Sequence, residues 1–230
     1  RTAGYYRAEE CRLSDFAELT ARDVTPQDVP NADATTRGVP VYDARRLADF
    51  LATPAGRVEV MAEWARILGD GAGVFVLRNA CPDHAAIDAA TQVFARIIAR
   101  EKAGRGAGSD HFAAAGSNDR IWNALQKLAL DAPETFLCYF ASPAIDAACE
   151  AWLGPNYQMT AQINLVHPGG AAQQAHRDYH LGFQTAESAA TYPAHVHDLS
   201  PLMTLQGGIA HCDMDLDSGP TKLLPFSQLY

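Results

Sequence analysis

The sequence lacks the features that mark nucleic-acid-binding and membrane proteins. Acidic residues outnumber lysine and arginine by 27 to 18, which gives a formal net charge of −9. A phosphate-binding surface requires a basic patch, and none is visible, so we expect no nucleic-acid partner. No apolar run approaches the roughly 18 residues that a membrane span requires, and no secretory signal is visible. We therefore expect no membrane partner either.

Cysteine is scarce and is not spaced for a structural role. The five cysteines are odd in number and widely separated, and they form no C-x-x-C pair. This pattern argues against a disulfide framework or a zinc–thiolate site. It favours free thiols in a reducing compartment, so we expect a cytoplasmic protein.

The signatures of two large enzyme classes are also missing. The chain has no G-x-S-x-G nucleophile elbow of the serine hydrolases. Glycines 69, 71 and 73 precede a predicted strand instead of joining a strand to a helix, which argues against a nucleotide-binding loop. The chemistry must therefore come from other residues.

The hydrophobic pattern changes from helical to strand-like along the chain. We predict helices near residues 43–52, 57–68, 83–98, 118–130 and 142–153, and strands near residues 74–77, 159–165 and 202–214. This order indicates an α+β fold, in which a β-sandwich or barrel is braced by N-terminal helices. A chain of 230 residues is compatible with one domain. We expect an irregular and helical extension over 1–72 and a core over 73–230.

The most informative motif is a histidine and an aspartate separated by one residue. His176 and Asp178 stand in the run Gln-Gln-Ala-His-Arg-Asp-Tyr-His-Leu-Gly-Phe at residues 173–183. On an extended strand, residues two apart point to the same side, so this imidazole and carboxylate can reach one metal ion. They are two-thirds of the 2-His-1-carboxylate triad that holds non-heme Fe(II). We predict a metal site on a strand here.

A polar strand face precedes this motif. The alternation over 159–165 leaves one face with the polar residues Thr160, Gln162 and Asn164. If the next strand pairs back across the turn at 167–170, this face lies beside the H-x-D motif. Its amide and hydroxyl groups would then line a cavity for a small carboxylate ligand. The alternative is a face that is simply solvated, as on many antiparallel sheets. We predict the cavity because the H-x-D motif follows directly.

Four segments, in the same order, resemble the phytanoyl-CoA dioxygenase family, a branch of the 2-oxoglutarate-dependent oxygenases. They are a Gly-Val-Phe-Val-Leu-Arg-Asn strand at 73–79, a helix ending in Leu-Gly at 144–154, a polar strand at 157–164 followed by H-x-D, and the run at 218–228. The last run resembles the family's N-G-P-[LT]-x-hydrophobic-hydrophobic-P-G-S-H segment. Phe226 replaces the usual Gly, and Gln228 replaces the usual His. The resemblance covers about residues 73–228.

This resemblance implies a double-stranded β-helix, or jelly roll, with Fe(II) at its open end. It implies His176 and Asp178 as metal ligands and Asn164 as a 2-oxoglutarate ligand, with Gln162 and Thr160 as further candidates. The family's distal His ligand and its 2-oxoglutarate-binding Arg are expected beyond Tyr230, so we expect the chain to be part of a longer polypeptide. The implied activity is hydroxylation of a small organic substrate with O2 and 2-oxoglutarate.

The other residues near the motif each have two possible roles. His180 faces the substrate or forms a hydrogen bond at the rim of the site, and Phe183 packs on the substrate or in the core. His211 and Asp213 form a second H-x-D pair, which is an alternative metal site. The histidines at 195 and 197 lie in a predicted polar connection that is a candidate lid over the site.

Two other classes of protein remain compatible with the sequence. One is a cupin-type enzyme that uses Zn2+ or Mn2+, with His211 or His180 completing the ligand set. The other is a non-catalytic jelly-roll binding protein that has lost the triad. Metal analysis and the position of a third ligand distinguish these classes from the oxygenase.

Overall fold

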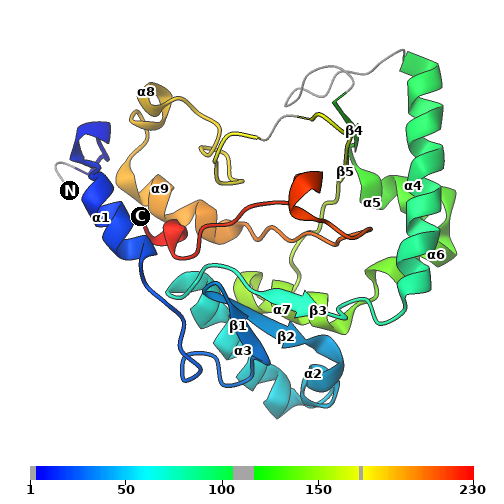
Figure 1. The fold of residues 1–230 in the computed structure, drawn as a ribbon, viewed down its shortest axis with the longest axis horizontal. Helices are drawn as coiled ribbons and strands as arrows, with labels where there is room; N and C mark the ends of the chain where they lie inside the picture. The colour runs from blue at the N-terminus through cyan, green and yellow to red at the C-terminus, as the bar shows by residue number, and fades with distance from the viewer. Residues whose placement is uncertain (1–3, 106–116, 171–172) are drawn as a thin grey trace.

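The computed structural model describes residues 4–105, 117–170 and 173–230, which form a mixed α/β structure with small sheets (Figure 1). The longer helices are α1 (Leu13–Thr20), α2 (Ala44–Leu51), α3 (Pro54–Gly69), α4 (His84–Arg105), α5 (Ala124–Asp131), α6 (Pro133–Phe140) and α7 (Pro143–Leu153). Shorter ones are α8 (Ala186–Ala189), α9 (Ala194–Leu199), η1 (Ala8–Glu10), η2 (Pro201–Met203), η3 (Leu216–Ser218) and η4 (Ser227–Leu229). The strands are β1 (Ala34–Thr36), β2 (Val39–Asp43), β3 (Val76–Arg78), β4 (Asn118–Ile121) and β5 (Ile163–Val166).

The first sheet has the order β1-β2-β3. β1 and β2 form an antiparallel hairpin whose two turn residues, Arg37 and Gly38, have φ of 52° and 76°. Two successive positive φ values are the geometry of a type I′ turn, which matches the twist of the flanking strands. β3 pairs parallel to β2, with Val41 opposite Val76, and α2 and α3 form the crossover between them.

The predicted helices with clear caps are confirmed. The Asp43 carboxylate accepts a hydrogen bond from the Arg45 backbone N–H at the start of α2. Ser142 caps α7 in the same way, accepting from Ile145 N–H, and Pro143 occupies the first turn. Gly154, with φ of 78°, ends α7, where only a residue free to adopt positive φ fits without strain.

The first hydrophobic core joins residues from both ends of the chain. Tyr42, Leu47 and Trp64 are fully buried between the sheet and the helices α2, α3 and α7. Phe226, close to the C-terminus, is only 3% exposed and belongs to the same core. Arg57 of α3 forms ion pairs with Asp146 and Glu150 of α7, both at 2.7 Å.

A carboxylate lies inside this core. Glu63 is 1% exposed and accepts hydrogen bonds from the Tyr42 hydroxyl at 2.6 Å and from the Asn31 amide at 2.8 Å. Burial and the bond to Glu63 raise the pKa of Tyr42, so this hydroxyl stays a donor at every physiological pH. The buried carboxylate is thereby satisfied, and it holds the loop before β1 against α3.

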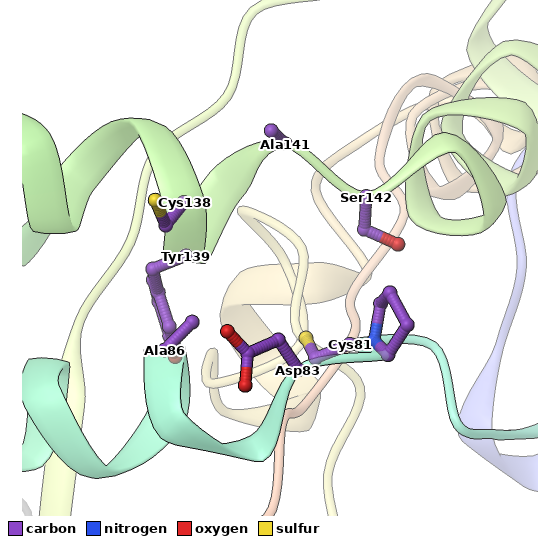
Figure 2. A pocket seen from close by; sticks show the side chains of 8 residues that line it. Cys81, Asp83, Ala86, Cys138, Tyr139, Ala141 and Ser142 are labelled. Atoms are coloured by element: carbon purple, nitrogen blue, oxygen red, sulfur yellow. The ribbon is translucent and has the colours of Figure 1, made fainter.

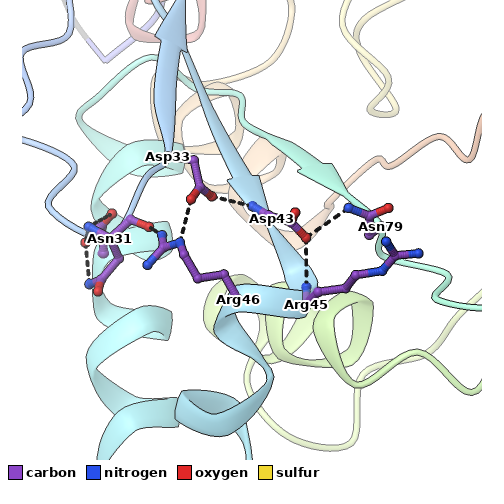
Figure 3. A network of polar contacts seen from close by, with 7 residues as sticks. Asn31, Asp33, Asp43, Arg45, Arg46 and Asn79 are labelled. Carbon is purple, nitrogen blue, oxygen red and sulfur yellow. Dashed lines mark hydrogen bonds and ion pairs between the residues drawn. The ribbon is translucent and has the colours of Figure 1, made fainter.

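A surface network fixes the edge of the sheet (Figure 3). The Asp33 carboxylate accepts from the Asp43 backbone N–H at 2.6 Å and pairs with the Arg46 guanidinium. Asn79, at the end of β3, donates to Asp43 at 2.9 Å. This bond, followed by that from Arg45 N–H, lowers the pKa of Asp43.

A second hydrophobic core lies between α4, α5, α6 and the β4-β5 pair. Its large buried side chains include Phe94, Ile97, Ile121, Leu128 and Tyr139. β4 and β5 are antiparallel, with Arg120 opposite Asn164. Ile209, from the irregular segment that follows η2, packs against this core.

The structure corrects two secondary-structure predictions. The predicted helix over 118–130 is wrong at its start, because residues 118–121 pair with β5 and Asn123, with φ of 55°, separates this strand from α5. The predicted strand over 202–214 is also wrong, because residues 202–203 lie in η2 and residues 204–214 have no regular structure. An isolated strand without a pairing neighbour leaves its ladder groups unsatisfied, and Gly207 and Gly208 further weaken it.

Two smaller adjustments concern the strand at 159–165 and the connection at 187–201. The strand is present but shorter, and it covers residues 163–166, so Thr160 and Gln162 precede it. The predicted polar connection contains α8 and α9 instead of an open loop. α9 is tied to the N-terminal segment, because Tyr6 donates from its hydroxyl to Asp198 at 2.6 Å.

Candidate metal centre

The H-x-D motif lies in a loop, so the prediction of a strand for residues 173–183 is wrong. Successive tight turns shape this loop: Tyr179 N–H donates to the Arg177 carbonyl, and Gly182 N–H donates to the Tyr179 carbonyl. Leu181 is buried at 4% exposure and anchors the turn. A Cβ at residue 182 would lie 1.6 Å from the Arg177 carbonyl oxygen, so the loop closes only with Gly182.

His176 and Asp178 nevertheless approach each other as a ligand pair must. The His176 Nε2 atom lies 3.2 Å from Asp178 Oδ1, and the two side chains are 23% and 30% exposed. His176 Nδ1 lies 2.6 Å from the Gln174 carbonyl oxygen. Because a carbonyl only accepts, Nδ1 carries the proton and donates to it. In the neutral imidazole, the lone pair on Nε2 therefore faces the carboxylate.

Either a proton or a metal ion between the two side chains would stabilise this arrangement. A nitrogen lone pair and a carboxylate oxygen repel each other at 3.2 Å unless a proton or a metal ion lies between them. A nitrogen and an oxygen atom at this separation are close enough to be ligands of one metal ion. The hydrogen bond from Nδ1–H to the Gln174 carbonyl is of the kind that orients ligand histidines. The residues present therefore fit a divalent metal.

The third protein ligand is not found in the described part of the chain. Within residues 4–105, 117–170 and 173–230, no group of three or more His, Cys, Asp or Glu side chains is placed to hold a metal ion. Among the described residues, His176 and Asp178 therefore offer two donor atoms and no third. The assignment of both residues as metal ligands stays a prediction.

His180 and Phe183 border the pair in different ways. His180 Nδ1 forms a 2.6 Å hydrogen bond with the Ser200 hydroxyl, and its ring packs edge-on against Tyr192. This contact ties the loop to the end of α9. The Phe183 ring lies 4.5 Å from the His176 ring and is 54% exposed. Phe183 therefore restricts the rotation of His176 and presents an apolar surface beside the pair.

The polar face predicted around Asn164 is present on the β4-β5 pair. Asn164 accepts from the Asn118 amide at 3.0 Å, and Gln162 accepts from the Arg120 guanidinium at 2.9 Å. Thr160 is exposed and lies before the strand. Among the described residues, no hydrogen bond or ion pair joins Asn164 or Gln162 to the H-x-D pair. The proposed cosubstrate face and the metal ligands are separate clusters in this structure.

Arg120 is a functional candidate that the sequence analysis missed. It lies directly opposite Asn164 in the β4-β5 register, and its guanidinium packs 5.3 Å from the Trp122 ring. The prediction of a helix over 118–130 did not suggest a role for Arg120, because it did not foresee the strand pairing that places Arg120 beside Asn164. The available signal was Asn123, a residue type that tolerates the positive φ by which the chain breaks between the strand and α5.

His211, the first residue of the second H-x-D pair, has both ring nitrogens occupied. Thr91 donates its hydroxyl proton to the Ile87 carbonyl, so its oxygen accepts from His211 Nδ1–H at 2.7 Å. Nε2 then accepts from the Tyr139 hydroxyl at 2.7 Å. These two hydrogen bonds hold the irregular segment after η2 against α4 and α6. His211 therefore has a structural role.

The partly buried position of His211 predicts a pH-dependent stability. Burial lowers the pKa of His211 below its ordinary value of 6.5. The unfolded chain therefore binds the proton more tightly, so the contribution to stability is complete above pH 6.5 and decreases as the pH falls below it. Between about pH 7.5 and about pH 5.5, the wild type should lose more unfolding free energy than His211→Gln, as measured by urea denaturation. The same change at exposed His195 should leave the pH dependence of the wild type unaltered.

A cavity of about 230 Å³ lies away from the predicted site (Figure 2). It is bordered by the segment before α4, the end of α6 and the start of α7, and its lining includes Cys81, Asp83, Cys138, Tyr139 and Ser142. Ser142 and Asp83 already cap α7 and α4, and the Tyr139 hydroxyl is bound to His211. None of the predicted site residues lines this cavity.

A family model for phytanoyl-CoA dioxygenase matches residues 69–230. The chain belongs to the phytanoyl-CoA dioxygenase family. No curated protein and no solved structure matches the chain. Membership of the phytanoyl-CoA dioxygenase family identifies the protein as an oxygenase and confirms the resemblance deduced from its four segments. In the described residues, every helix is too short or too polar to cross a membrane.

Proposed function

We propose that the protein is an Fe(II)- and 2-oxoglutarate-dependent dioxygenase that hydroxylates a small organic molecule. The observation that carries this proposal is the His176–Asp178 pair, whose Nε2 and Oδ1 atoms converge to 3.2 Å. The tautomer fixed by the Gln174 carbonyl leaves Nε2 free to bind a metal ion. A nitrogen and an anionic oxygen on one face are the ligand types of non-heme Fe(II) oxygenases.

When bound, Fe(II) supplies the activation of O2, coupled to decarboxylation of 2-oxoglutarate to succinate and CO2, that oxidises the substrate. The protein residues hold, orient and shield the reactants. His176 and Asp178 would hold the metal, together with one further His that the family's ligand set requires. Phe183 limits water beside the imidazole, since its ring covers one side of His176. Asp178 keeps the carboxylate that hydroxylation, as opposed to halogenation, requires.

The polar face on β4 and β5 is proposed to hold the cosubstrate. Asn164 and Gln162 present amide groups, and Arg120 adds a guanidinium that suits a carboxylate through paired hydrogen bonds. Thr160 precedes these residues and adds a hydroxyl to the same segment. The described residues form two small sheets, so the jelly roll that the resemblance implies stays a prediction. In this proposal, that jelly roll would bring the polar face next to the H-x-D loop, which follows β5 in sequence.

A turnover assay tests the proposal. The full natural chain, incubated with Fe(II), ascorbate, 2-oxoglutarate and a panel of small carboxylic acids and acyl thioesters, should form succinate. Formation should require both Fe(II) and 2-oxoglutarate and should increase with the true substrate. Stoichiometric zinc in protein purified without added metal, together with no binding of 2-oxoglutarate, would instead support the cupin-type enzyme.

A further inference from the structure

The residue between the two predicted ligands forms a long-range contact. Arg177 donates from Nη2 to the carbonyl oxygen of Ser227 at 2.8 Å, across 50 positions of sequence. Its own carbonyl accepts from Tyr179 N–H and lies against the Gly182 backbone. Arg177 therefore connects the tightest part of the H-x-D loop to the C-terminal turn.

The turn that carries Ser227 is itself firmly held. Phe226 is 3% exposed in the first hydrophobic core, and its N–H donates to the Ala72 carbonyl at 2.9 Å. Gln228 donates from Nε2 to the Gly71 carbonyl, also at 2.9 Å. The Arg22 guanidinium lies over the Phe226 ring at 4.8 Å. The Ser227 carbonyl is thus a fixed acceptor, tied on both sides to the loop that follows α3.

These anchors coincide with the departures of this chain from the pattern of its family. Phe226 stands where the family has Gly, and it adopts a φ of 66°, a left-handed conformation that strains a residue with a side chain. Gln228 stands where the family has His. Phe226 and Gln228 fix the Ser227 carbonyl, to which Arg177 binds. We call residues 226–228 the 226–228 anchor, and we call the hydrogen bond from Arg177 to Ser227 the Arg177 tether.

We infer that Arg177 is a positioning residue, which holds the His176–Asp178 pair in its converged geometry through the 226–228 anchor. The inference rests on the proposed function, in which that pair binds the metal. The loop has no regular secondary structure, so its ligand geometry depends on such tertiary tethers. A planar guanidinium is suited to this task, since it donates in a fixed direction and stays charged at every working pH.

Metal titration of Arg177→Met tests this role, since methionine keeps much of the side-chain length but donates no hydrogen bond. Titrated with Co2+ as the probe and followed by its visible absorption, the variant should bind about 10–100-fold more weakly than wild type, as when partners of metal ligands are removed. Arg177→Lys, which retains a donor, should recover part of the affinity. Arg100→Met serves as the matched control, because Arg100, on α4, donates at 2.7 Å to Asp131 at the end of α5.

Two further readouts separate positioning from general destabilisation. Hydrogen exchange over residues 173–183 should accelerate in Arg177→Met and remain unchanged in Arg100→Met. Gln228→Ala should weaken Co2+ binding too, and the double variant should show less than the sum of the two effects, because both act on one tether. Unchanged exchange and Co2+ affinity within twofold of wild type in Arg177→Met would overturn the inference.

Failure of the proposed function has a different signature. If wild-type protein binds neither Co2+ nor Fe(II), the oxygenase proposal fails, and with it the role of Arg177 toward a metal. Hydrogen exchange over 173–183 then decides separately whether the tether exists. If the wild-type protein binds metal and the Arg177 variants match it in affinity and hydrogen exchange, the inferred role of Arg177 is wrong. The oxygenase proposal then stands.

Discussion

Replacing His176 and Asp178 together by alanine is expected to abolish both Fe(II) binding and succinate formation. Both donor atoms of the converged pair are lost, so the loop no longer offers a side chain of the pair to hold the ion. The fold should persist, since the two side chains contribute little to either hydrophobic core. The measurements are the iron content after gel filtration, succinate formation and the far-ultraviolet circular dichroism spectrum.

The matched control is His84→Ala with Asp88→Ala. His84 and Asp88 are exposed on α4. Their substitution removes the same two types of side chain at a place far from the loop. Their double variant should retain iron and turnover at wild-type levels. Wild-type turnover in the His176→Ala, Asp178→Ala protein would refute the oxygenase assignment.

Phe226→Gly restores the residue usual in the family and should nevertheless destabilise the protein by about 3 kcal/mol. Removal of a buried phenylalanine side chain costs about 3–5 kcal/mol. Glycine recovers about 1–2 kcal/mol, because it adopts the φ of 66° without strain. It then loses about 0.5–1 kcal/mol through the greater backbone entropy of the unfolded state. Packing therefore dominates, and the unfolding free energy from urea denaturation should fall.

Leu224→Ala provides the comparison within the same segment. Leu224 is 51% exposed, so its truncation should change the unfolding free energy by no more than about 0.5 kcal/mol. A stability of Phe226→Gly equal to or above that of wild type would show that backbone strain outweighs packing at this turn. In that case the Phe226 side chain in the core would not be what holds the 226–228 anchor in place.

The helices were the most predictable part of the fold, because their signals are local. Asp43 and Ser142 each cap a helix at the predicted position, and Gly154 ends one as expected. A side-chain oxygen that accepts from the backbone N–H two or three residues ahead needs no tertiary partner. Such boundaries follow from the sequence alone.

The strands were less predictable, because pairing decides them. Residues 118–121 contain a single apolar residue, Ile121, so their sequence does not distinguish a strand from a helix, and only the pairing with β5 makes them a strand. Residues 202–214 have strand-like composition but lack a neighbour among the described residues. Strand formation depends on such distant contacts much more than helix formation does.

The candidate site was partly predictable for a similar reason. The H-x-D spacing correctly indicated that His176 and Asp178 lie close together. The segment is nevertheless a loop with a tight turn at Gly182, and not the predicted strand. The contacts of Arg177 with Ser227 and of Arg120 with Gln162 span 50 and 42 positions. No local pattern indicates contacts over such separations, so these two residues emerge only from the fold.

Anaerobic titration of the wild-type protein with Fe(II) and 2-oxoglutarate tests the central claim most directly. When 2-oxoglutarate chelates a protein-bound Fe(II) through its keto and carboxylate oxygens, a visible metal-to-ligand charge-transfer band develops. We predict this band for wild type with one Fe(II) per chain, and its absence in the variant that lacks His176 and Asp178. A band of equal intensity in that variant, or no Fe(II) binding by wild type, would contradict the account.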